Sequence, residues 1–242
     1  MNIEYFINNW KNIKEEDISF TTDEWKEISS YKYLSEDFIE RYQNKVDWYS
    51  ISYFQVLSEE FIEKHKDKVN WSYISRCQNL SEKFIKKHKN KVVWYWISMY
   101  QSLSESFIKK HKHTVGWDCI SYYQNLSEAF IEKHKDKVDW VEVSAHQKLS
   151  EDFIEQHKDK VNWFYISKCQ SLSEKFIYKH QDKISYYNCL NKYYRLRYKL
   201  CIHDHISFSI HTNNNYGIFI QWKDKGFNLL TIPANIIFRD IL

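Results

Sequence analysis

The hydrophobic positions of this chain repeat with a fixed period. In residues 57–78, LSEEFIEKHKDKVNWSYISRCQ, the pattern of Leu, Phe-Ile, Val, Trp and Ile returns twenty-three residues later as LSEKFIKKHKNKVVWYWISMYQ. A fixed period in this range is typical of a repeat array in which each unit buries its apolar face against its neighbours. The Leu-Ser-Glu opening stands at Leu34, Leu57, Leu80, Leu103, Leu126, Leu149 and Leu172.

The first half of each unit predicts a short helix. Ser58 is a good N-cap, and Glu59 follows in the first turn, where the helix dipole favours an acid. Leu57 before the cap and Ile62 within the helix have the spacing of a hydrophobic staple. The helix should end near Lys66–Asp67, because Asp or Asn at that position tolerates the left-handed backbone conformation.

The second half of each unit predicts another short helix. Its Trp, Ile, Ser and Gln fall at i, i+3, i+4 and i+7, which is one face of a helix. In a strand, Trp71 and Ile74 would point to opposite faces. The cap position before the Trp holds Asp47, Asn70, Asp139 and Asn162, with Val93 and Gly116 as departures.

Both ends of the chain depart from the repeat. The alternation of apolar and polar residues after position 205 predicts a three-stranded antiparallel meander. Its strands are expected at Ile206–His211, Gly217–Trp222 and Phe227–Ile232. The sequence thus predicts a mainly α fold, an α-solenoid of about seven helical pairs over residues 24–195. An N-terminal cap covers residues 1–23, and a β-rich C-terminal cap covers residues 196–242.

Composition narrows the class of protein. The formal net charge is +3 with acids and bases interspersed, unlike the clustered basic face of a typical nucleic-acid binder. The five cysteines show no CxxC spacing, which indicates free thiols in a reducing compartment. Residues 1–10 lack a signal-peptide pattern, and no apolar run approaches the length of a membrane span. We therefore expect a cytoplasmic protein without a membrane partner.

Three polar residue types recur with the repeat, and each has a structural interpretation. The glutamate after each N-cap Ser is expected to favour the helix N-terminus. The glutamine that follows each second helix is expected to hydrogen-bond backbone groups of a neighbouring turn. Neighbouring units stack about 8–10 Å apart, too far for the recurring histidines to converge on one metal ion, so we expect packed imidazoles beside polar partners. These histidines are His65, His88, His111, His134, His157 and His180.

The recurring glutamates, glutamines and histidines do not form a catalytic acid–base pair. No second acid recurs that could form an acid–base pair with the repeated glutamate, so we expect no enzyme activity. The tail offers the other candidate metal ligands, and we expect neither set to hold a metal or any cofactor. These tail residues are His203, Asp204, His205 and His211.

The positions at which the repeats differ define a candidate partner-binding surface. They lie just after Trp and just after Ser in each second helix, opposite the Trp-Ile-Ser-Gln face, so they should be exposed. Large side chains are nevertheless common there, and Tyr, Trp, Met and Arg are enriched at the cores of protein interfaces. The alternative is that they pack beneath a neighbouring unit or against a second molecule. The candidates are Tyr49, Tyr53, Phe54, Tyr73, Arg76, Tyr95, Trp96, Met99, Tyr100, Tyr122, Tyr123, Phe164, Tyr165 and Lys168.

The outer face of the first helices is rich in lysine. In most units interleaved acids cancel much of this charge, which favours a solvated face. The central units carry fewer acids, and their lysines could steer an acidic partner or RNA. We define the basic patch as Lys86, Lys87, Lys109 and Lys110.

The units LSEEFIEKHKDKVNW and LSEKFIKKHKNKVVW resemble tandem repeats of uncharacterised proteins from giant DNA viruses, other large viruses, some phages and low-GC bacteria. The resemblance covers residues 24–186, in which Leu-Ser-Glu, Phe-Ile, His, Val, Trp and Ile-Ser recur together. It implies a solenoid and a viral or phage origin, and it carries no established activity.

These patterns favour a non-enzymatic protein–protein interaction module whose second helices contact the partner. With the resemblance added, the module would be a virus- or phage-encoded inhibitor or counter-defence protein that binds a host or viral protein. Two alternatives stay open. One is a solenoid that binds RNA or other nucleic acid through the central lysines and aromatic stacking. The other is a sponge that holds a small anionic ligand between Lys and Tyr side chains.

Overall fold

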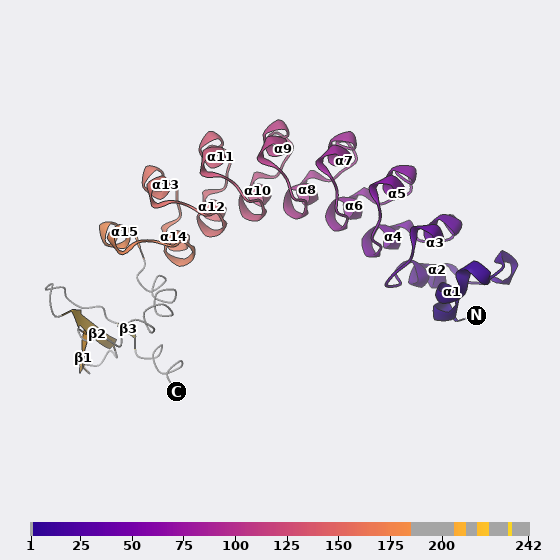
Figure 1. Cartoon of the computed structure of the whole chain (residues 1–242), viewed down its shortest axis with the longest axis horizontal. Coiled ribbons are helices and arrows are strands. Elements are labelled where there is room, and N and C mark those ends of the chain that lie inside the picture. The colour runs from indigo at the N-terminus through magenta and orange to yellow at the C-terminus, as the bar shows by residue number, and fades with distance from the viewer. Residues whose placement is uncertain (1, 185–205, 212–216, 223–231, 234–242) are drawn as a thin grey trace. The chain divides into compact units, whose positions relative to one another are not determined.

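The computed structural model describes residues 2–184, 206–211, 217–222 and 232–233. The chain forms two compact units, residues 1–176 and 177–242, and each is described by itself. The first unit holds the repeats (Figure 1). The prediction of a mainly α fold built from regularly repeating short helices is confirmed for this unit.

The chain begins with a small aromatic cluster. Helix α1 spans Ile3–Asn9, two 3₁₀ turns follow at Trp10–Asn12 and Glu15–Asp17, and helix α2 spans Thr22–Ser29. Phe6 is completely buried, with its ring 5.7 Å from the rings of both Trp25 and Phe38. The segment before α2 therefore covers the apolar start of the repeat array, as expected of a cap. The predicted boundaries of the three domains stay a prediction.

Each repeat contains two helices, which we call its first and second helix. The first helices are α3 (Glu36–Arg41), α5 (Glu59–Lys64), α7 (Glu82–Lys87), α9 (Glu105–Lys110), α11 (Glu128–Lys133), α13 (Glu151–Gln156) and α15 (Glu174–Lys179). The second helices are α4 (Trp48–Phe54), α6 (Trp71–Cys77), α8 (Trp94–Tyr100), α10 (Trp117–Tyr123), α12 (Trp140–His146) and α14 (Trp163–Cys169). From α3 to α14 the two sets form parallel rows along an arc, with the second helices on its inner side (Figure 1).

The predicted caps are present. The Ser58 side chain accepts a hydrogen bond from the backbone N–H of Phe61, and the equivalent serines do the same in every first helix from α3 to α13. Asn70 caps α6 in the same way, as do the Asp and Asn residues at the start of α4, α12 and α14. Val93 and Gly116 provide no side-chain cap, in agreement with the departures read from the sequence.

The repeated apolar residues form the interior of the first unit. In the second repeat Leu57, Phe61, Ile62, Val69 and Ile74 are all buried, and their equivalents are buried in the other repeats. The tryptophans differ from the expectation of a fully inward face. Among the tryptophans that begin the second helices, every one is half-buried, because each ring lies across the edge between two units.

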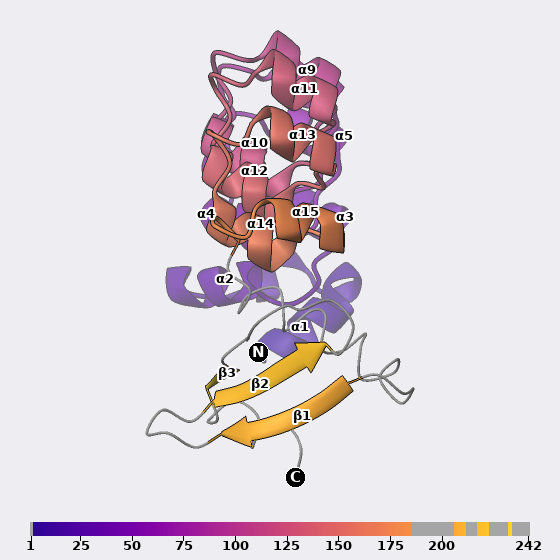
Figure 2. The same cartoon turned by 90° about the vertical axis from the view of Figure 1, so that its left-hand side faces the viewer.

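The C-terminal unit contains a three-stranded antiparallel sheet with the order β1-β2-β3. Strands β1 (Ile206–His211) and β2 (Gly217–Trp222) have the predicted bounds and pair from Ile206 opposite Trp222 to His211 opposite Gly217 (Figure 2). Strand β3 is Ile232–Pro233, whereas most of the predicted third strand lies outside the described residues. The predicted continuation of the last helix to residue 195 also lies outside them, and the capping role of the sheet stays a prediction.

Candidate partner-binding face

The recurring glutamine fixes each second helix to the preceding repeat. Gln101 is 4% exposed, and its Nε2 donates hydrogen bonds to the carbonyl oxygens of Ser75 at 3.0 Å and Gln78 at 2.8 Å. Its Oε1 accepts a hydrogen bond from the backbone N–H of Leu80 at 2.9 Å. The predicted bond to backbone groups of a neighbouring turn is therefore confirmed. One amide side chain satisfies three buried backbone groups, which would otherwise cost stability.

The serine on the same face provides a second link between repeats. Ser98 Oγ donates to the carbonyl oxygen of Trp94 at 2.7 Å and accepts from the backbone N–H of Gly116 at 3.0 Å. The same pair of bonds recurs for Ser52, whose Oγ binds Trp48 and the N–H of Asn70. The N-cap residue of each second helix is thus hydrogen-bonded to the serine of the preceding second helix.

The tryptophan ring lies against the first helix of the following repeat. The Trp71 ring stacks at 6.2 Å on Phe84 and lies 4.8 Å from the His88 ring, while its Nε1 donates to the Lys66 carbonyl oxygen at 2.9 Å. Lys91 Nζ stands 5.6 Å from the same ring, at cation–π distance. One side of each second helix is occupied in this way. The opposite side of the helix is left exposed to solvent.

That exposed side of the second helices, which we call the aromatic face, carries the candidate residues predicted from the sequence. Most of them are exposed: Tyr49 is 54% exposed, Tyr100 48% and Phe164 53%. Four are half-buried, which the sequence did not predict: Tyr73, Trp96, Met99 and Tyr165. The exposed members are Tyr49, Tyr53, Phe54, Arg76, Tyr95, Tyr100, Tyr122, Tyr123, Phe164 and Lys168.

The structure brings candidates from different repeats into contact near the start of the array. The Tyr49 and Tyr73 rings meet edge to face at 4.7 Å, and their hydroxyls are hydrogen bonded. The Tyr53 ring also lies 4.9 Å from the Tyr73 ring. Tyr73 is therefore half-buried because two tyrosines of the preceding repeat flank it. The face is continuous from one repeat to the next here.

A second cluster joins α6 and α8. The Arg76 guanidinium carbon lies 5.2 Å from the centroid of the Trp96 ring and 5.7 Å from that of Tyr100. The Trp96 Nε1 donates to Ser72 Oγ at 3.1 Å, which holds the indole over the preceding helix. The cluster therefore combines aromatic area with a cationic group that is itself exposed. Arginine and tryptophan in such a setting are common binding hot spots.

The third cluster includes a residue that sequence reasoning missed. The His146 ring lies 3.8 Å from the Tyr122 ring, which lies 4.2 Å from Tyr123, and His146 also pairs with Glu142 at 3.4 Å. Burial and the neighbouring Tyr122 raise the pKa of the Tyr123 hydroxyl. His146 occupies the same repeat position as Tyr100 and Tyr123, so its register was the signal that could have identified it.

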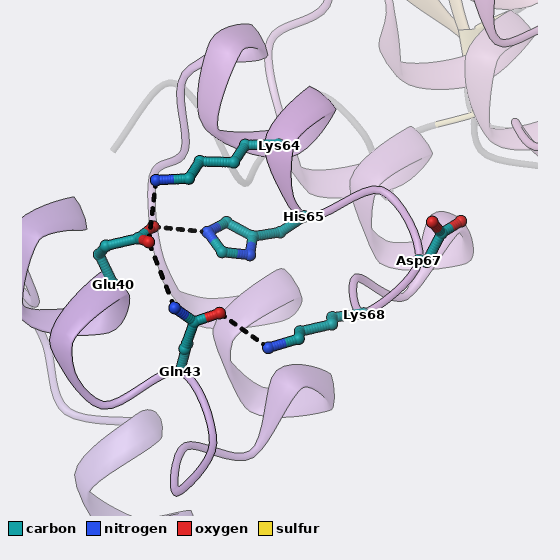
Figure 3. A pocket seen from close by; sticks show the side chains of 6 residues that line it. All are labelled: Glu40, Gln43, Lys64, His65, Asp67 and Lys68. Carbon is teal, nitrogen blue, oxygen red and sulfur yellow. Dashed lines mark hydrogen bonds and ion pairs between the residues drawn. The ribbon is translucent and has the colours of Figure 1, made fainter.

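A polar pocket lies on the other side of the repeats, between successive first helices (Figure 3). Glu40 receives Lys64 Nζ at 2.8 Å and pairs with His65 Nε2 at 2.7 Å, while Lys68 Nζ donates to Gln43 Oε1 at 2.9 Å. These residues line a cavity of about 290 Å³. His65 is buried, so the predicted packed imidazole with a polar partner is confirmed at this repeat.

The glutamate after each N-cap serine also has a role that was not predicted. Glu36 Oε1 accepts a hydrogen bond at 2.6 Å from the backbone N–H of Ser58, the N-cap of the next first helix. The same contact joins Glu59 to Ser81. The acid does lie in the first turn of its own helix, as expected, but it also links two repeats. A recurring acid at one position fits either role, so the sequence alone does not separate them.

The four lysines of the basic patch differ in whether they pair with an acid. Lys87 pairs with Glu63 at 3.0 Å, so its charge is compensated. Lys86, Lys109 and Lys110 are exposed, and no ion pair to an acid is found for them among the described residues. All four lie on first helices, in the row opposite the aromatic face. The patch and the aromatic face are therefore separate surfaces.

Residues 2–184 and the three strands contain no group of three or more His, Cys, Asp or Glu that could hold a metal ion. Of the tail candidates, His203, Asp204 and His205 lie outside the described residues. None of the described helices combines the length and apolar character needed to span a bilayer. The predictions of no enzyme activity and no cofactor are untested.

No protein-family model, no curated protein and no solved structure matches this chain. What the sequence and the fold establish is a tandem array of short helices with a period of about 23 residues.

Proposed function

We propose that this chain is a non-enzymatic protein-binding module whose aromatic face contacts a protein partner. One observation carries the proposal: large side chains that differ between repeats stay about half exposed on a scaffold whose other contacts repeat. Tyr95 and Tyr123 are 48% and 49% exposed, whereas Ile97 and Ile120 in the same helices are completely buried. Tyr, Trp and Arg concentrate binding energy at protein interfaces.

The layout favours a protein over nucleic acid. Proteins that bind single strands combine a basic groove with aromatic side chains on which the bases stack, so both must lie along one path. Here the uncompensated lysines are on α7 and α9, and the aromatic face is on the second helices, in the other row (Figure 1). The second helices themselves carry both signs of charge, because they hold Arg76 and Lys168 as well as Asp118 and Glu142. Binding of RNA stays an alternative outcome of the test below.

The resemblance to viral and phage repeats adds the biological setting. It would make the partner a host protein and the chain a virus- or phage-encoded inhibitor or counter-defence protein acting in the cytoplasm. The complete architecture of about seven helical pairs, closed at the far end by the β-rich segment of residues 196–242, belongs to the same proposal. An array with capped ends and one variable face is the usual form of a repeat protein that recognises a partner.

The test compares captured partners between matched variants of the full chain. The double variant Trp96→Ala/Tyr100→Ala removes the centre of the α6–α8 cluster. The control Tyr33→Ala removes an aromatic that is 75% exposed and lies outside the second helices. We expect wild type and Tyr33→Ala to retain the same captured protein after nuclease treatment, and the double variant to lose it with an unchanged circular dichroism spectrum.

Two results would contradict the proposal. Retention of the captured protein by the double variant would show that the contact lies elsewhere. Capture that disappears after nuclease treatment, in wild type as well, would favour the nucleic-acid alternative. If the double variant loses its helical signal, Tyr100→Ala alone replaces it, because Tyr100 is more exposed than Trp96.

A further inference from the structure

Two of the pockets between first helices lack their acid. In the complete pocket at His88, the Glu63 carboxylate receives Lys87 at 3.0 Å, His88 at 2.6 Å and Lys66 at 3.4 Å. One repeat later Lys86 occupies the position of Glu63, and two repeats later Lys109 does. The positions of the three cationic partners are kept, so each of these two pockets holds four basic side chains and no acid at the central position. The four are Lys86, Lys89, Lys110 and His111 in one, and Lys109, Lys112, Lys133 and His134 in the other.

The imidazole of the second pocket is held as if its acid were present. The His134 ring lies 5.1 Å from the Trp117 ring and 4.5 Å from Phe130, and the His88 ring lies 4.8 Å and 4.5 Å from the equivalent rings. His134 is 8% exposed, and its buried Nε2 has no hydrogen-bond partner. The corresponding atom of His88 is the one that contacts Glu63. A buried polar atom without a partner is destabilising, so this position of the free chain favours a ligand that supplies a hydrogen-bond acceptor.

The cations around both imidazoles act on them directly. Burial, followed by Lys133, Lys112, Lys137 and Lys109, lowers the pKa of His134 below its ordinary value. Burial, followed by Lys86, Lys89 and Lys110, lowers the pKa of His111, and Glu82 opposes this only weakly. Asp136, two residues after His134, pairs with Lys160 of the next repeat at 3.6 Å. Both imidazoles are therefore uncharged at neutral pH, within a positive local field.

We propose that the pocket at His134 binds a phosphate-type dianion in place of the missing carboxylate, and that the pocket at His111 binds a second one. Replacement of an acid by a lysine changes the local charge by two units, which a dianion compensates and a monoanion does not. The phosphate oxygens accept hydrogen bonds from the lysine ammonium groups and from the Nε2–H of the neutral His134 imidazole. Because Nε2 is covered from solvent, the anion reaches it only when neighbouring side chains move aside. This site is independent of the aromatic face and of the proposed function.

Inorganic phosphate is the first probe, added to the full chain with sodium chloride of equal ionic strength as reference. Nuclear magnetic resonance of the imidazole nitrogens reports each histidine separately. We expect phosphate to shift the His111 and His134 resonances and to raise both pKa values, while His88 stays unchanged because Glu63 already fills its pocket. Absence of a phosphate-specific shift at His134, or an equal shift at His88, would overturn the proposal.

A pair of charge-matched variants tests where the anion binds. Lys86→Glu/Lys109→Glu restores the acid found at the His88 pocket, so the variant should fold and should melt at a higher temperature without phosphate. Its phosphate binding should weaken by roughly tenfold or more, since charge-assisted hydrogen bonds are worth more than one factor of ten. The control Lys83→Glu/Lys148→Glu makes the same change in net charge at two exposed positions and should bind phosphate like wild type. Equal binding by both variants would contradict the proposal.

Two further ligands distinguish free phosphate from a phosphate group on a larger molecule, and a dianion from a monoanion. O-phosphoserine carries the same dianion on a larger molecule, and acetate carries a single charge. Binding of O-phosphoserine with the affinity of inorganic phosphate would assign the pockets to phosphomonoesters, whereas binding of inorganic phosphate alone would assign them to the free ion. Acetate that binds as tightly as phosphate would overturn the dianion assignment.

Discussion

The Nε2 atom of His88 lies 2.6 Å from Oε2 of Glu63, a residue of the preceding repeat. The contact joins two successive first helices, α5 and α7, on the outer side of the arc. Lys87 shares the same carboxylate, and together these groups lower the pKa of Glu63 to about 2, with Lys87 as the largest cause. The ionised acid is therefore part of the adhesion between repeats.

This pairing makes stability depend on pH in a defined window. Because the pKa of Glu63 is lower in the folded chain than the ordinary glutamate value of 4.5, the contribution of Glu63 to stability is fully present above about pH 4.5. It is lost as the pH falls through about 2. We expect Glu63→Gln to be less stable than wild type in urea at pH 7, with the difference shrinking toward pH 2. Glu60→Gln, an exposed acid on the same helix, is the control, and a difference that does not change with pH would contradict the assignment.

Removal of a ladder glutamine should be more damaging than loss of one surface contact. Gln101→Ala leaves two buried carbonyl groups and one buried N–H without their partner. Unsatisfied buried groups cost about 1–3 kcal/mol each, and water entry relieves part of this, so we expect a loss of about 2–4 kcal/mol in urea unfolding. Asn79→Ala, at an exposed position between two repeats, should change stability by less than about 0.5 kcal/mol. A loss of similar size in both would show that the glutamine bonds contribute little.

The two missing caps offer a gain in stability. α8 begins after Val93, which has an extended backbone and no side-chain cap, whereas Asn70 supplies two hydrogen bonds at the same position of α6. We expect Val93→Asn to stabilise the chain by about 1 kcal/mol, the usual value of an N-cap. Val93→Ala removes the same side chain without adding an acceptor and should not stabilise. Chemical denaturation of both variants measures the difference directly.

The repeating part of the fold could be predicted from sequence because its signals are local. A capping serine three residues before the Phe amide and an Asx residue before the Trp determine where helices begin, and both depend on spacing within a few residues. The Gln ladder was also predictable, since an amide after a helix end faces backbone groups that the helix leaves open. Ser58 and Asn70 therefore lie where the sequence placed them.

The features that could not be predicted from the sequence depend on contacts between repeats. Nothing local shows that Glu36 reaches the N–H of Ser58, or that Tyr73 is partly covered by Tyr49 and Tyr53. The tryptophans that begin the second helices were expected to be inward, yet each of them lies at the edge between two units and keeps part of its surface exposed. Exposure of this kind is set by the distance and angle between stacked units, which periodicity alone does not determine.

Trp117 gives a last prediction about how the array comes apart. Its ring stacks on Phe130 at 6.3 Å, and its Nε1 donates to the Lys112 carbonyl oxygen at 3.0 Å, so it joins the repeat of α10 to that of α11. A fully buried Trp→Ala change costs about 3–5 kcal/mol, and because Trp117 is half-buried we expect about 2–3 kcal/mol for Trp117→Ala.

The same variant should also lose cooperativity. In a linear array each repeat contacts only its neighbours, so a weakened interface lets the two sides unfold separately. The interface of Trp117 is already weak, because Lys109 stands where an acid pairs with the histidine in other repeats. We therefore expect Trp117→Ala to show a lower urea m-value or two transitions, and Trp71→Ala, at the interface with an intact Glu63–His88 pair, to keep one. A single transition of unchanged m-value in Trp117→Ala would contradict this, since it would mean that the central interface still couples the two sides.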